Sequence, residues 1–282
     1  MKQLLNLFKL RIGVAIALAA AAGLVVQGGA GWAAGLALVA AVLVASSAAG
    51  AFNQYVERDI DSRMARTRGR PFVTGELSHG PFWLWLIGAM LGASVLAAAL
   101  AANLFAALYV FLGAFTYGVV YTVWLKRRTP WNIVIGGAAG SFAVLAGAAA
   151  VSSSIGPTSL GLAVVLFLWT PPHFWSLAIA CRADYQAAGV PMLPAVVGDA
   201  RAARAVLAGT VLLVAASLVP IGHGLSWLYA ITAAASGFYF LQKSIALVRA
   251  PGRKTAMANF HASLVQLSLL LTAAIVDATL LG

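Results

Sequence analysis

The chain has 282 residues, of which 62% are hydrophobic and only 9% are charged. A water-soluble domain of this length cannot bury so much apolar surface, so the composition excludes a soluble globular protein. A net charge of +11 is compatible with nucleic-acid binding, but the basic residues are confined to a few connections, which argues against a nucleic-acid partner.

The apolar segments, taken in chain order, are long enough to cross a membrane as helices. A hydrocarbon core of roughly 30 Å requires about 20 helical residues. The nine segments span approximately residues 10–27, 32–56, 81–101, 104–124, 132–151, 158–180, 204–221, 225–246 and 262–281. The sequence therefore predicts an all-α polytopic membrane protein with one membrane domain over residues 1–282.

The positions of the basic residues predict the topology. All 18 Lys and Arg residues lie in the N-terminal tail or in the connections after the second, fourth, sixth and eighth segments. With nine helices, these connections share one membrane face, and basic connections are typical of the cytoplasmic face. We expect a bacterial-type inner-membrane location, with a cytoplasmic N-terminus and the C-terminus on the opposite side.

Acidic residues gather where the second segment reaches this face. Asn53, Glu57 and Asp61 have the spacing i, i+4, i+8, which places them on one face of a continued helix. Like charges at this spacing repel each other, and oxygen ligands of this kind suit Mg²⁺, which fills its shell with water and phosphate oxygens. A solvated helix end is the alternative, and spacing alone leaves both interpretations open.

The sixth segment ends at the same face with a further acid, Asp184. The second and sixth segments run in the same direction, as expected if helices 1–4 and 5–8 form a parallel pseudo-repeat followed by helix 9. Arg66 and Arg70, in the connection after the second segment, and Lys126, after the fourth, are candidate donors to a diphosphate.

Several motifs resemble a known family. The stripe Asn53–Asp61, followed by Arg66-Thr-Arg-Gly-Arg-Pro71, resembles the first motif of the UbiA superfamily of intramembrane prenyltransferases. The segments 121–137, 169–175 and 184–194 resemble the haem-farnesylating branch of that superfamily. This resemblance runs over nearly the whole chain.

The resemblance implies nine helices around a central cavity, with an active site on the cytoplasmic side and Mg²⁺ as cofactor. Asn53, Glu57 and Asp61 match the first Mg²⁺–diphosphate motif, and Asp184 matches the second. The chain also departs from the family pattern. Glu57 stands where many relatives have Asp, Ala180 and Ala188 flank Asp184 where a second acid is common, and Ala143-Val144 replaces a Pro-Pro pair.

The implied reaction transfers the farnesyl group of farnesyl diphosphate to a vinyl group of haem b, with water supplying the hydroxyl of haem O. The implied partners are these two substrates, the lipid bilayer, and a haem A synthase or terminal-oxidase assembly partner. Three rivals remain open at this stage. One is an intramembrane prenyltransferase for another aromatic or tetrapyrrole acceptor, such as a quinone precursor, and the second is a transporter. The third is a non-catalytic assembly or scaffold protein, which would leave the acidic stripe unexplained.

Other residues are candidates for substrate contact. Tyr117, Tyr121 and Trp124 have helical spacing i, i+4, i+7, which suits either stabilisation of an allylic cation or an interfacial aromatic belt. His173 lies 11 residues before Asp184, roughly 16 Å deeper along a helix. Its imidazole is a candidate for haem contact, and the alternative is a hydrogen bond to a neighbouring helix.

Pairs of glycines recur in the apolar segments, at Gly31/Gly35, Gly88/Gly92 and Gly136/Gly140. Small residues at this spacing either allow close helix contact or leave room for an isoprenoid tail, and close contact is the more common use.

Overall fold

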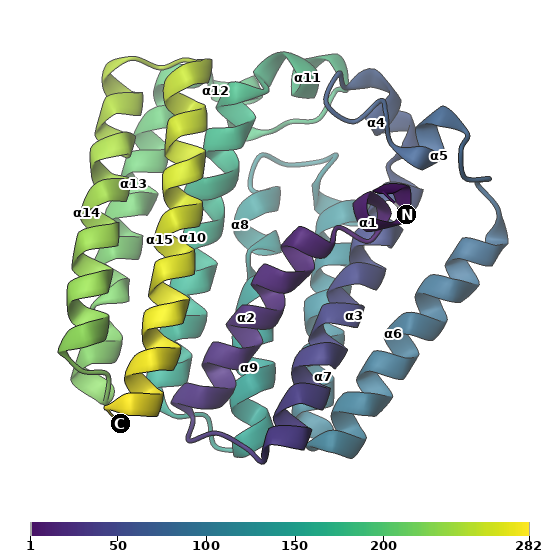
Figure 1. The fold of residues 1–282 in the computed structure, drawn as a ribbon. Coiled ribbons are helices and arrows are strands. Elements are labelled where there is room, and N and C mark those ends of the chain that lie inside the picture. The colour runs from purple at the N-terminus through teal and green to yellow at the C-terminus, as the bar shows by residue number, and fades with distance from the viewer. Residues whose placement is uncertain (1, 282) are drawn as a thin grey trace.

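The computed structural model describes residues 2–281, and within that range the chain forms only helices and their connections (Figure 1). The predicted all-α class is confirmed. The helices are α1 (Lys2–Leu7), α2 (Leu10–Val26), α3 (Trp32–Val56), α4 (Arg58–Arg63), α5 (Pro71–Thr74), α6 (Pro81–Ala101), α7 (Leu104–Phe115), the π-helix η1 (Thr116–Leu125), α8 (Asn132–Gly136), α9 (Ala138–Val151), α10 (Pro157–Ala180), α11 (Arg182–Ala187), α12 (Leu193–Val197), α13 (Asp199–Ser217), the 3-10 helix η2 (Val219–His223), α14 (Trp227–Arg249) and α15 (Arg253–Leu280).

Each of the nine predicted segments coincides with helix. Among the described residues, eight helical stretches are long and apolar enough to cross a membrane, and α2 is a shorter apolar helix of 17 residues. At 1.5 Å per residue α2 reaches about 25 Å, slightly less than a typical hydrocarbon core. The last segment starts earlier than predicted, at Arg253, because its first turns are polar and carry no hydropathy signal.

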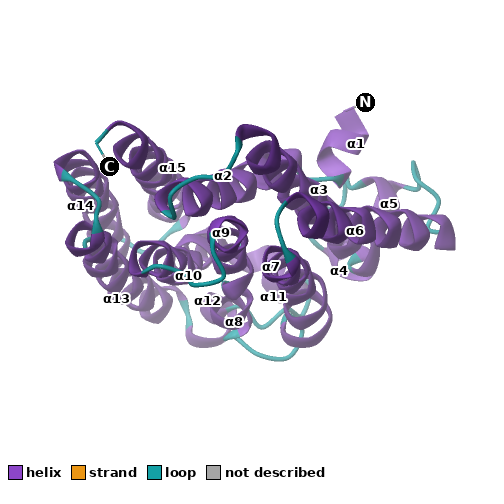
Figure 2. Cartoon of the chain, turned by 90° about the horizontal axis from the view of Figure 1, so that it is seen from below, coloured by secondary structure: helices purple, strands orange, loops and turns teal. Residues whose placement is uncertain are grey.

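The short helices lie at one end of the bundle. In Figure 1, α4, α5, α11 and α12 lie at its top with α1 near them, whereas the C-terminus lies at the bottom. We call the upper end the polar end, because it holds the motifs around Asn53–Asp61 and Asp184. In the view from below, α9 lies near the middle of the bundle, and it packs against α2, α7 and α10 (Figure 2).

The tightest helix crossing joins α2 and α9. A Cβ atom added to Gly147 would lie 1.9 Å from the carbonyl oxygen of Ala20, and one added to Gly23 would lie 2.1 Å from that of Val144. Only glycine permits this backbone contact. This pair could not be predicted from the sequence, since the two glycines lie in different segments and form no local motif.

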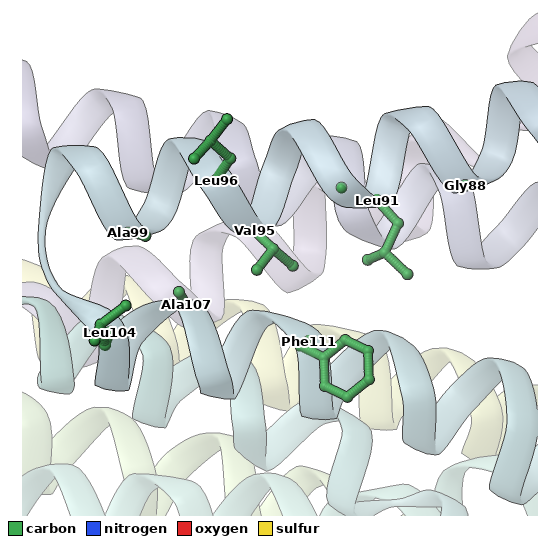
Figure 3. Close-up of a pocket in the computed structure, with 9 residues that line it drawn as sticks. Gly88, Leu91, Val95, Leu96, Ala99, Leu104, Ala107 and Phe111 are labelled. Carbon is green, nitrogen blue, oxygen red and sulfur yellow. The ribbon is translucent and has the colours of Figure 1, made fainter.

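The pair Gly88/Gly92 does not serve helix contact. An added Cβ at either position would meet no atom within 4 Å, and both glycines line an apolar groove of about 500 Å³ between α6 and α7 (Figure 3). Leu96 and Leu104 beside it are 59% and 79% exposed, so the groove lies on the outer surface. In the pair Gly136/Gly140, Gly136 does pack closely, against the ring of Tyr121.

Candidate active site

Three polar residues form a buried stripe at the polar end, where α3 passes into α4. The backbone N–H of Glu57 donates to the carbonyl of Asn53 at 3.0 Å, and that of Asp61 donates to the carbonyl of Glu57 at 2.8 Å. The i to i−4 ladder therefore continues through the joint between the two helices, as the spacing predicts. The residues are only 2%, 1% and 2% exposed, which contradicts the alternative of a solvated helix end.

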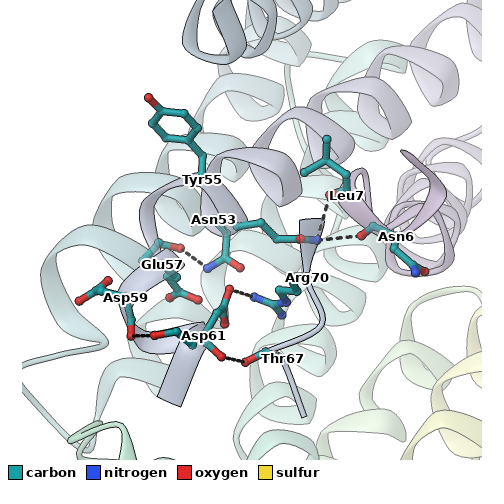
Figure 4. Close-up of polar contacts among 12 residues, drawn as sticks. Asn6, Leu7, Asn53, Tyr55, Glu57, Asp59, Asp61, Thr67 and Arg70 are labelled. Carbon is teal, nitrogen blue, oxygen red and sulfur yellow. Dashed lines mark hydrogen bonds and ion pairs between the residues drawn. The ribbon is translucent and has the colours of Figure 1, made fainter. Parts of the chain in front are cut away.

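Each residue of the stripe contacts one basic side chain from another segment of the chain. The pairs are Asn53 Oδ1 with Lys9 Nζ at 2.6 Å, both carboxylate oxygens of Glu57 with Lys126 Nζ at 2.5 Å, and Asp61 Oδ2 with Arg70 Nη1 at 2.5 Å. Figure 4 shows Arg70 reaching Asp61 beside the labelled stripe residues. These cations offset the repulsion that two buried carboxylates would otherwise impose.

Lys126 reaches the stripe because the preceding segment is a π-helix. The backbone N–H of Lys126 donates to the carbonyl of Tyr121 at 2.9 Å, and the hydroxyl of Thr122 donates to that of Tyr117 at 2.8 Å, both across five residues. The hydroxyl of Thr122 also accepts from the amide of Asn53 at 3.1 Å. Wide turns of this kind are frequent at functional sites.

The π-helix also changes the predicted aromatic stripe. Tyr117 and Tyr121 stack at 5.7 Å between ring centroids, with Lys9 Nζ 5.5 Å from the first ring and Lys126 Nζ 5.7 Å from the second. Trp124 does not join them, since it is 50% exposed on the outer surface. The expected alignment of all three rings is wrong, because i+7 falls on another face when the turn is wider than 3.6 residues.

Lys9 is a site residue that the sequence analysis assigned only to topology. It forms the hinge between α1 and α2, and its φ of 47° makes it the only non-glycine residue with positive φ in the described chain. Its ammonium donates to Asn53 and, at 2.9 Å, to the hydroxyl of Tyr117. Burial, with a smaller contribution from Arg70, lowers the pKa of Lys9 to about 7. No local motif marks the residue.

Asp184 contacts the connection that follows the stripe. Its carboxylate accepts the backbone N–H groups of Ala65 and Arg66 at 3.2 Å and 3.3 Å. The same connection holds Arg70 against Asp61, and Thr67 within it donates to the carbonyl of Asp61 at 3.1 Å. The structure thus brings the two acidic motifs to opposite sides of one short connection.

The stripe offers oxygen donors to a divalent cation. Among residues 2–281, no three His, Cys, Asp or Glu side chains are grouped to hold a metal ion, and Glu57 and Asp61 form ion pairs with Lys126 and Arg70. The donor set nevertheless fits Mg²⁺. It consists of two buried carboxylates and one amide oxygen on a single helical face, and hard oxygen donors of this kind are its preferred protein ligands.

A basic cavity lies beside the stripe. It has a volume of about 370 Å³, and its lining includes Lys9, Arg66 and Arg70 but no acidic residue. Gln54 also lines it: the side-chain N–H donates to the carbonyls of Asn6 and Leu7, at 2.8 Å and 3.3 Å, and its buried Oε1 has no partner. The cavity suits an anionic group.

His173 lies deeper in the bundle, on α10, and is 5% exposed. Its ring is stacked between Trp169 and Phe260, at centroid distances of 4.0 Å and 4.4 Å. Its Nδ1 is 2.6 Å from the hydroxyl of Ser263 on α15, so the alternative of a hydrogen bond to another helix is confirmed. This bond leaves Nε2 for another partner, and haem contact stays a prediction.

The chain resembles known proteins over most of its length. Residues 12–270 match the model of the UbiA prenyltransferase family. The chain is 58% identical to protoheme IX farnesyltransferase 2 of Paramagnetospirillum magneticum, with 100% of this chain and 99% of the relative covered. It is 48% identical to protoheme IX farnesyltransferase 1 of the same organism, with 98% of each covered.

Solved structures share the fold at low sequence identity. A structure of digeranylgeranylglyceryl phosphate synthase superposes with a TM-score of 0.78 at 18% identity, covering 98% of both chains. A UbiA homologue from Archaeoglobus fulgidus bound to DMAPP and Mg²⁺ superposes with a TM-score of 0.68 at 15% identity, covering 99% of this chain and 100% of the other. These similarities establish the architecture of a membrane prenyltransferase.

Proposed function

This chain belongs to the UbiA prenyltransferase family, and we propose that it transfers the farnesyl group of farnesyl diphosphate to a vinyl group of haem b, giving haem O and diphosphate. The observation that carries this proposal is the full-length similarity, at 58% and 48% identity, to two protoheme IX farnesyltransferases. These relatives do not favour a quinone precursor as acceptor, or transport.

The reaction breaks the bond between C1 of the farnesyl chain and the diphosphate oxygen. C1 then bonds to the terminal carbon of the vinyl group, the adjacent carbon becomes electron-deficient, and water adds there with loss of a proton. The leaving diphosphate gains negative charge as the first bond breaks, and positioned cations at a buried site stabilise such charge. Arg66, Arg70 and Lys126 are the proposed donors, because they lie beside the stripe or line the basic cavity.

Mg²⁺ is the proposed cofactor, and when bound it would supply Lewis-acid stabilisation of the diphosphate. Asn53, Glu57 and Asp61 would hold it from the helical face, with Asp184 contributing from α11, where its carboxylate accepts the backbone N–H groups of Ala65 and Arg66. The fit of the buried oxygen donors supports this assignment, as does the Mg²⁺ in the Archaeoglobus fulgidus homologue.

The acceptor and the allylic cation would lie deeper than the diphosphate. Tyr117 and Tyr121 are proposed to face the cation, since their rings already lie near ammonium groups. His173 is proposed to contact the haem. Its burial below the polar end supports this role, because the macrocycle must reach the farnesyl chain from the apolar part of the bundle.

The protein is a multi-pass membrane protein. We place it in the inner membrane with the polar end in the cytoplasm, because basic connections mark that face. The pseudo-repeat of helices 1–4 and 5–8 followed by helix 9, and an assembly partner that receives the product, stay predictions from the sequence.

Reconstitution of the purified protein tests the proposed function. The protein in lipid nanodiscs would receive farnesyl diphosphate with either haem b or 4-hydroxybenzoate, with and without Mg²⁺, and products would be identified by mass spectrometry. Haem O formed only with haem b and Mg²⁺ is the expected result. A farnesylated benzoate without haem O would overturn the choice of acceptor, and haem O formed equally well after complete metal chelation would overturn the cofactor.

A further inference from the structure

Gln266 is a polar side chain that the bundle buries without a partner. It lies on α15 and is 0% exposed, and neither its amide nitrogen nor its amide oxygen has a hydrogen-bond partner among residues 2–281. An unpaired amide in an apolar bundle is costly, so buried polar groups are normally bonded to protein or to ordered water. Both ends of this amide are therefore available to a ligand.

The other polar residues on this face of α15 serve helix contact. Asn259, Ser263 and Gln266 have the spacing i, i+4, i+7, which places them in one row along the helix. The amide of Asn259 donates to the hydroxyl of Ser176 on α10 at 2.9 Å and accepts that of Ser244 on α14 at 3.0 Å. Gln266 makes no such contact, so packing of helices does not account for its polar group.

The hydrogen bonds of Ser263 fix the tautomer of His173. The Ser263 hydroxyl donates to the carbonyl of Phe260 at 2.7 Å, so its proton is not directed at the imidazole. Nδ1 of His173, 2.6 Å from the same hydroxyl oxygen, is then the donor, and in a neutral imidazole Nε2 carries the lone pair. Since Ser263 lies one helical turn from Gln266, a proton acceptor and a free amide lie beside the same part of α15.

This part of the bundle is level with the candidate active site and is uncharged. Gln266 lies at the middle of α15, which has 28 residues and begins at Arg253. In Figure 1 the middle of α15 is level with the start of α2, where Lys9 contacts the stripe. Residues 255–276 contain no Lys, Arg, Asp or Glu. A neutral amide in such a stretch suits a neutral ligand such as water, and not an ionised carboxylate of haem.

We infer, on the basis of the proposed function, that Gln266 and Nε2 of His173 hold the water that hydrates the farnesylated haem, with Gln266 as a water-positioning residue. Once C1 of the farnesyl chain has bonded to the terminal vinyl carbon, the adjacent carbon is electron-deficient. The water oxygen forms a C–O bond to that carbon, and one water proton passes to Nε2 of His173. The product is the alcohol, and no oxidant or reductant is required. The reacting carbon belongs to the haem, so this role agrees with the haem contact proposed for His173.

The hydrogen-bonding groups match the needs of one water molecule. The amide of Gln266 can donate to the water oxygen and accept one of its protons, while Nε2 of His173 accepts the other proton. This satisfies the about three hydrogen bonds that a buried water usually makes. The remaining lone pair of the water oxygen is then free to attack the cation.

The cation also has a competing fate, which makes the position of the water decisive. It can lose a proton from the neighbouring carbon, where the new carbon–carbon bond has formed, and become an alkene that is lighter than haem O by one water molecule. Bulk water is excluded from the apolar bundle, so only a water held beside the cation can capture it as the alcohol.

The ratio of these two products tests the inference. Purified protein in lipid nanodiscs receives farnesyl diphosphate, Mg²⁺ and haem b, and the alcohol, the alkene and total farnesylated haem are quantified by mass spectrometry. Gln266→Met keeps the length of the side chain but removes the amide. The ratio of alcohol to alkene should fall by about tenfold or more, while total farnesyl transfer changes less. Gln266→Asn, which keeps an amide on a shorter side chain, should give an intermediate ratio.

Ser244→Ala is the matched control. Ser244 is also buried and polar, but its hydroxyl is bonded to Thr210 and Asn259, at 3.0 Å each. This variant should leave the product ratio unchanged. If Gln266→Met does not fold, Gln266→Leu takes its place.

Three results would overturn the inference alone. The first is a folded Gln266→Met or Gln266→Leu variant with an unchanged product ratio. The second is a loss of alcohol without any alkene, because a residue that positions water acts after the carbon–carbon bond has formed. The third is an equal fall of the ratio in Ser244→Ala. If the unaltered protein forms no farnesylated haem at all, the proposed function itself fails, and the inference fails with it.

Discussion

The ammonium of Lys126 lies 2.5 Å from both carboxylate oxygens of Glu57, although 69 residues separate them in the sequence. The Glu57 side chain is 1% exposed and that of Lys126 is 11% exposed, so water screens this pair poorly. The contact ties α3 to the end of η1 and depends on the π-helix that precedes Lys126. The π-helix η1 thus places the ammonium of Lys126 at the candidate active site.

Removal of Lys126 should therefore affect both stability and activity. In Lys126→Met the buried carboxylate of Glu57 loses its partner, and breaking a buried pair on one side costs about 3–5 kcal/mol. We expect a lower midpoint of thermal unfolding in detergent and little haem O formation. The double variant Lys126→Met/Glu57→Gln should recover part of the stability, since no buried carboxylate would then remain unpaired. It should recover none of the activity, because both proposed site residues are then lost.

The pair Arg127–Asp59 is the matched control for this experiment. Arg127 follows Lys126 directly, and its guanidinium contacts Asp59 at 2.7 Å and 2.8 Å, but these side chains are 42% and 51% exposed. An exposed pair contributes less than about 1 kcal/mol. Arg127→Met should therefore leave the unfolding midpoint and the rate of haem O formation nearly unchanged. A loss as large as that of Lys126→Met would contradict the assignment.

Asp61→Asn should abolish most activity while preserving the fold. The substitution keeps the size of the side chain and its contact with Arg70, but it removes a negative charge from the proposed Mg²⁺ site. Loss of one electrostatic contact of this kind typically lowers kcat by about 10²- to 10³-fold. Single-turnover formation of haem O measures the effect. Wild-type activity of Asp61→Asn at low Mg²⁺ concentration would show that Asp61 does not hold the metal.

Periodicity identified the stripe because its three residues belong to one continuous stretch of helix. The spacing of Asn53, Glu57 and Asp61 needs only local geometry, and the backbone ladder through the joint preserves it. The nine apolar segments were found for the same reason, since hydropathy along a single helix is a local property. Both features could be read without knowledge of the tertiary structure.

The partners of the stripe could not be found in this way. Lys9 looks like an ordinary member of the basic N-terminal tail, and only the tertiary arrangement shows its contact with Asn53. The sequence predicts Lys126 as a donor to a diphosphate, but its contact with Glu57 appears only in the tertiary arrangement. The π-helix that positions Lys126 has no sequence marker, and an α-helical spacing assumed in its place misplaced Trp124. Non-local contacts and irregular helical turns could therefore not be predicted from the spacing of residues in the sequence.

The crossing of α2 and α9 gives a prediction about stability alone. Gly147→Ala should destabilise the bundle, because the new methyl group would lie 1.9 Å from a backbone oxygen that cannot move freely. Overpacking of this kind costs about 1–3 kcal/mol or more. Gly92→Ala is the control, since its Cβ would enter the open groove between α6 and α7. Unfolding midpoints of the two variants in the same detergent provide the measurement, and equal midpoints would refute the proposed crossing.

Asp277 should stabilise the far end of the bundle without a part in the chemistry. It is buried on α15, and its carboxylate accepts the N–H groups of Ser226 and Tyr229 at 2.9 Å each, thereby capping the N-terminus of α14. Asp277→Ala leaves these groups without a partner and should cost about 1–3 kcal/mol. The folded fraction should retain the normal KM for farnesyl diphosphate. A selective rise in that KM would place Asp277 at the active site instead.

His173 should affect the acceptor and not the prenyl donor. Its hydrogen bond to Ser263 and its stacking against Trp169 and Phe260 fix the ring, so His173→Gln tests the free nitrogen with little change in volume. If Nε2 contacts haem, the variant should raise the KM for haem b and shift the Soret band of the bound haem, while the KM for farnesyl diphosphate stays unchanged. Ser263→Ala keeps the imidazole but removes its hydrogen bond, and should cause a smaller shift. An unaltered haem spectrum in both variants would assign His173 to helix packing alone, because a buried imidazole that touches the macrocycle cannot be replaced without a spectral change.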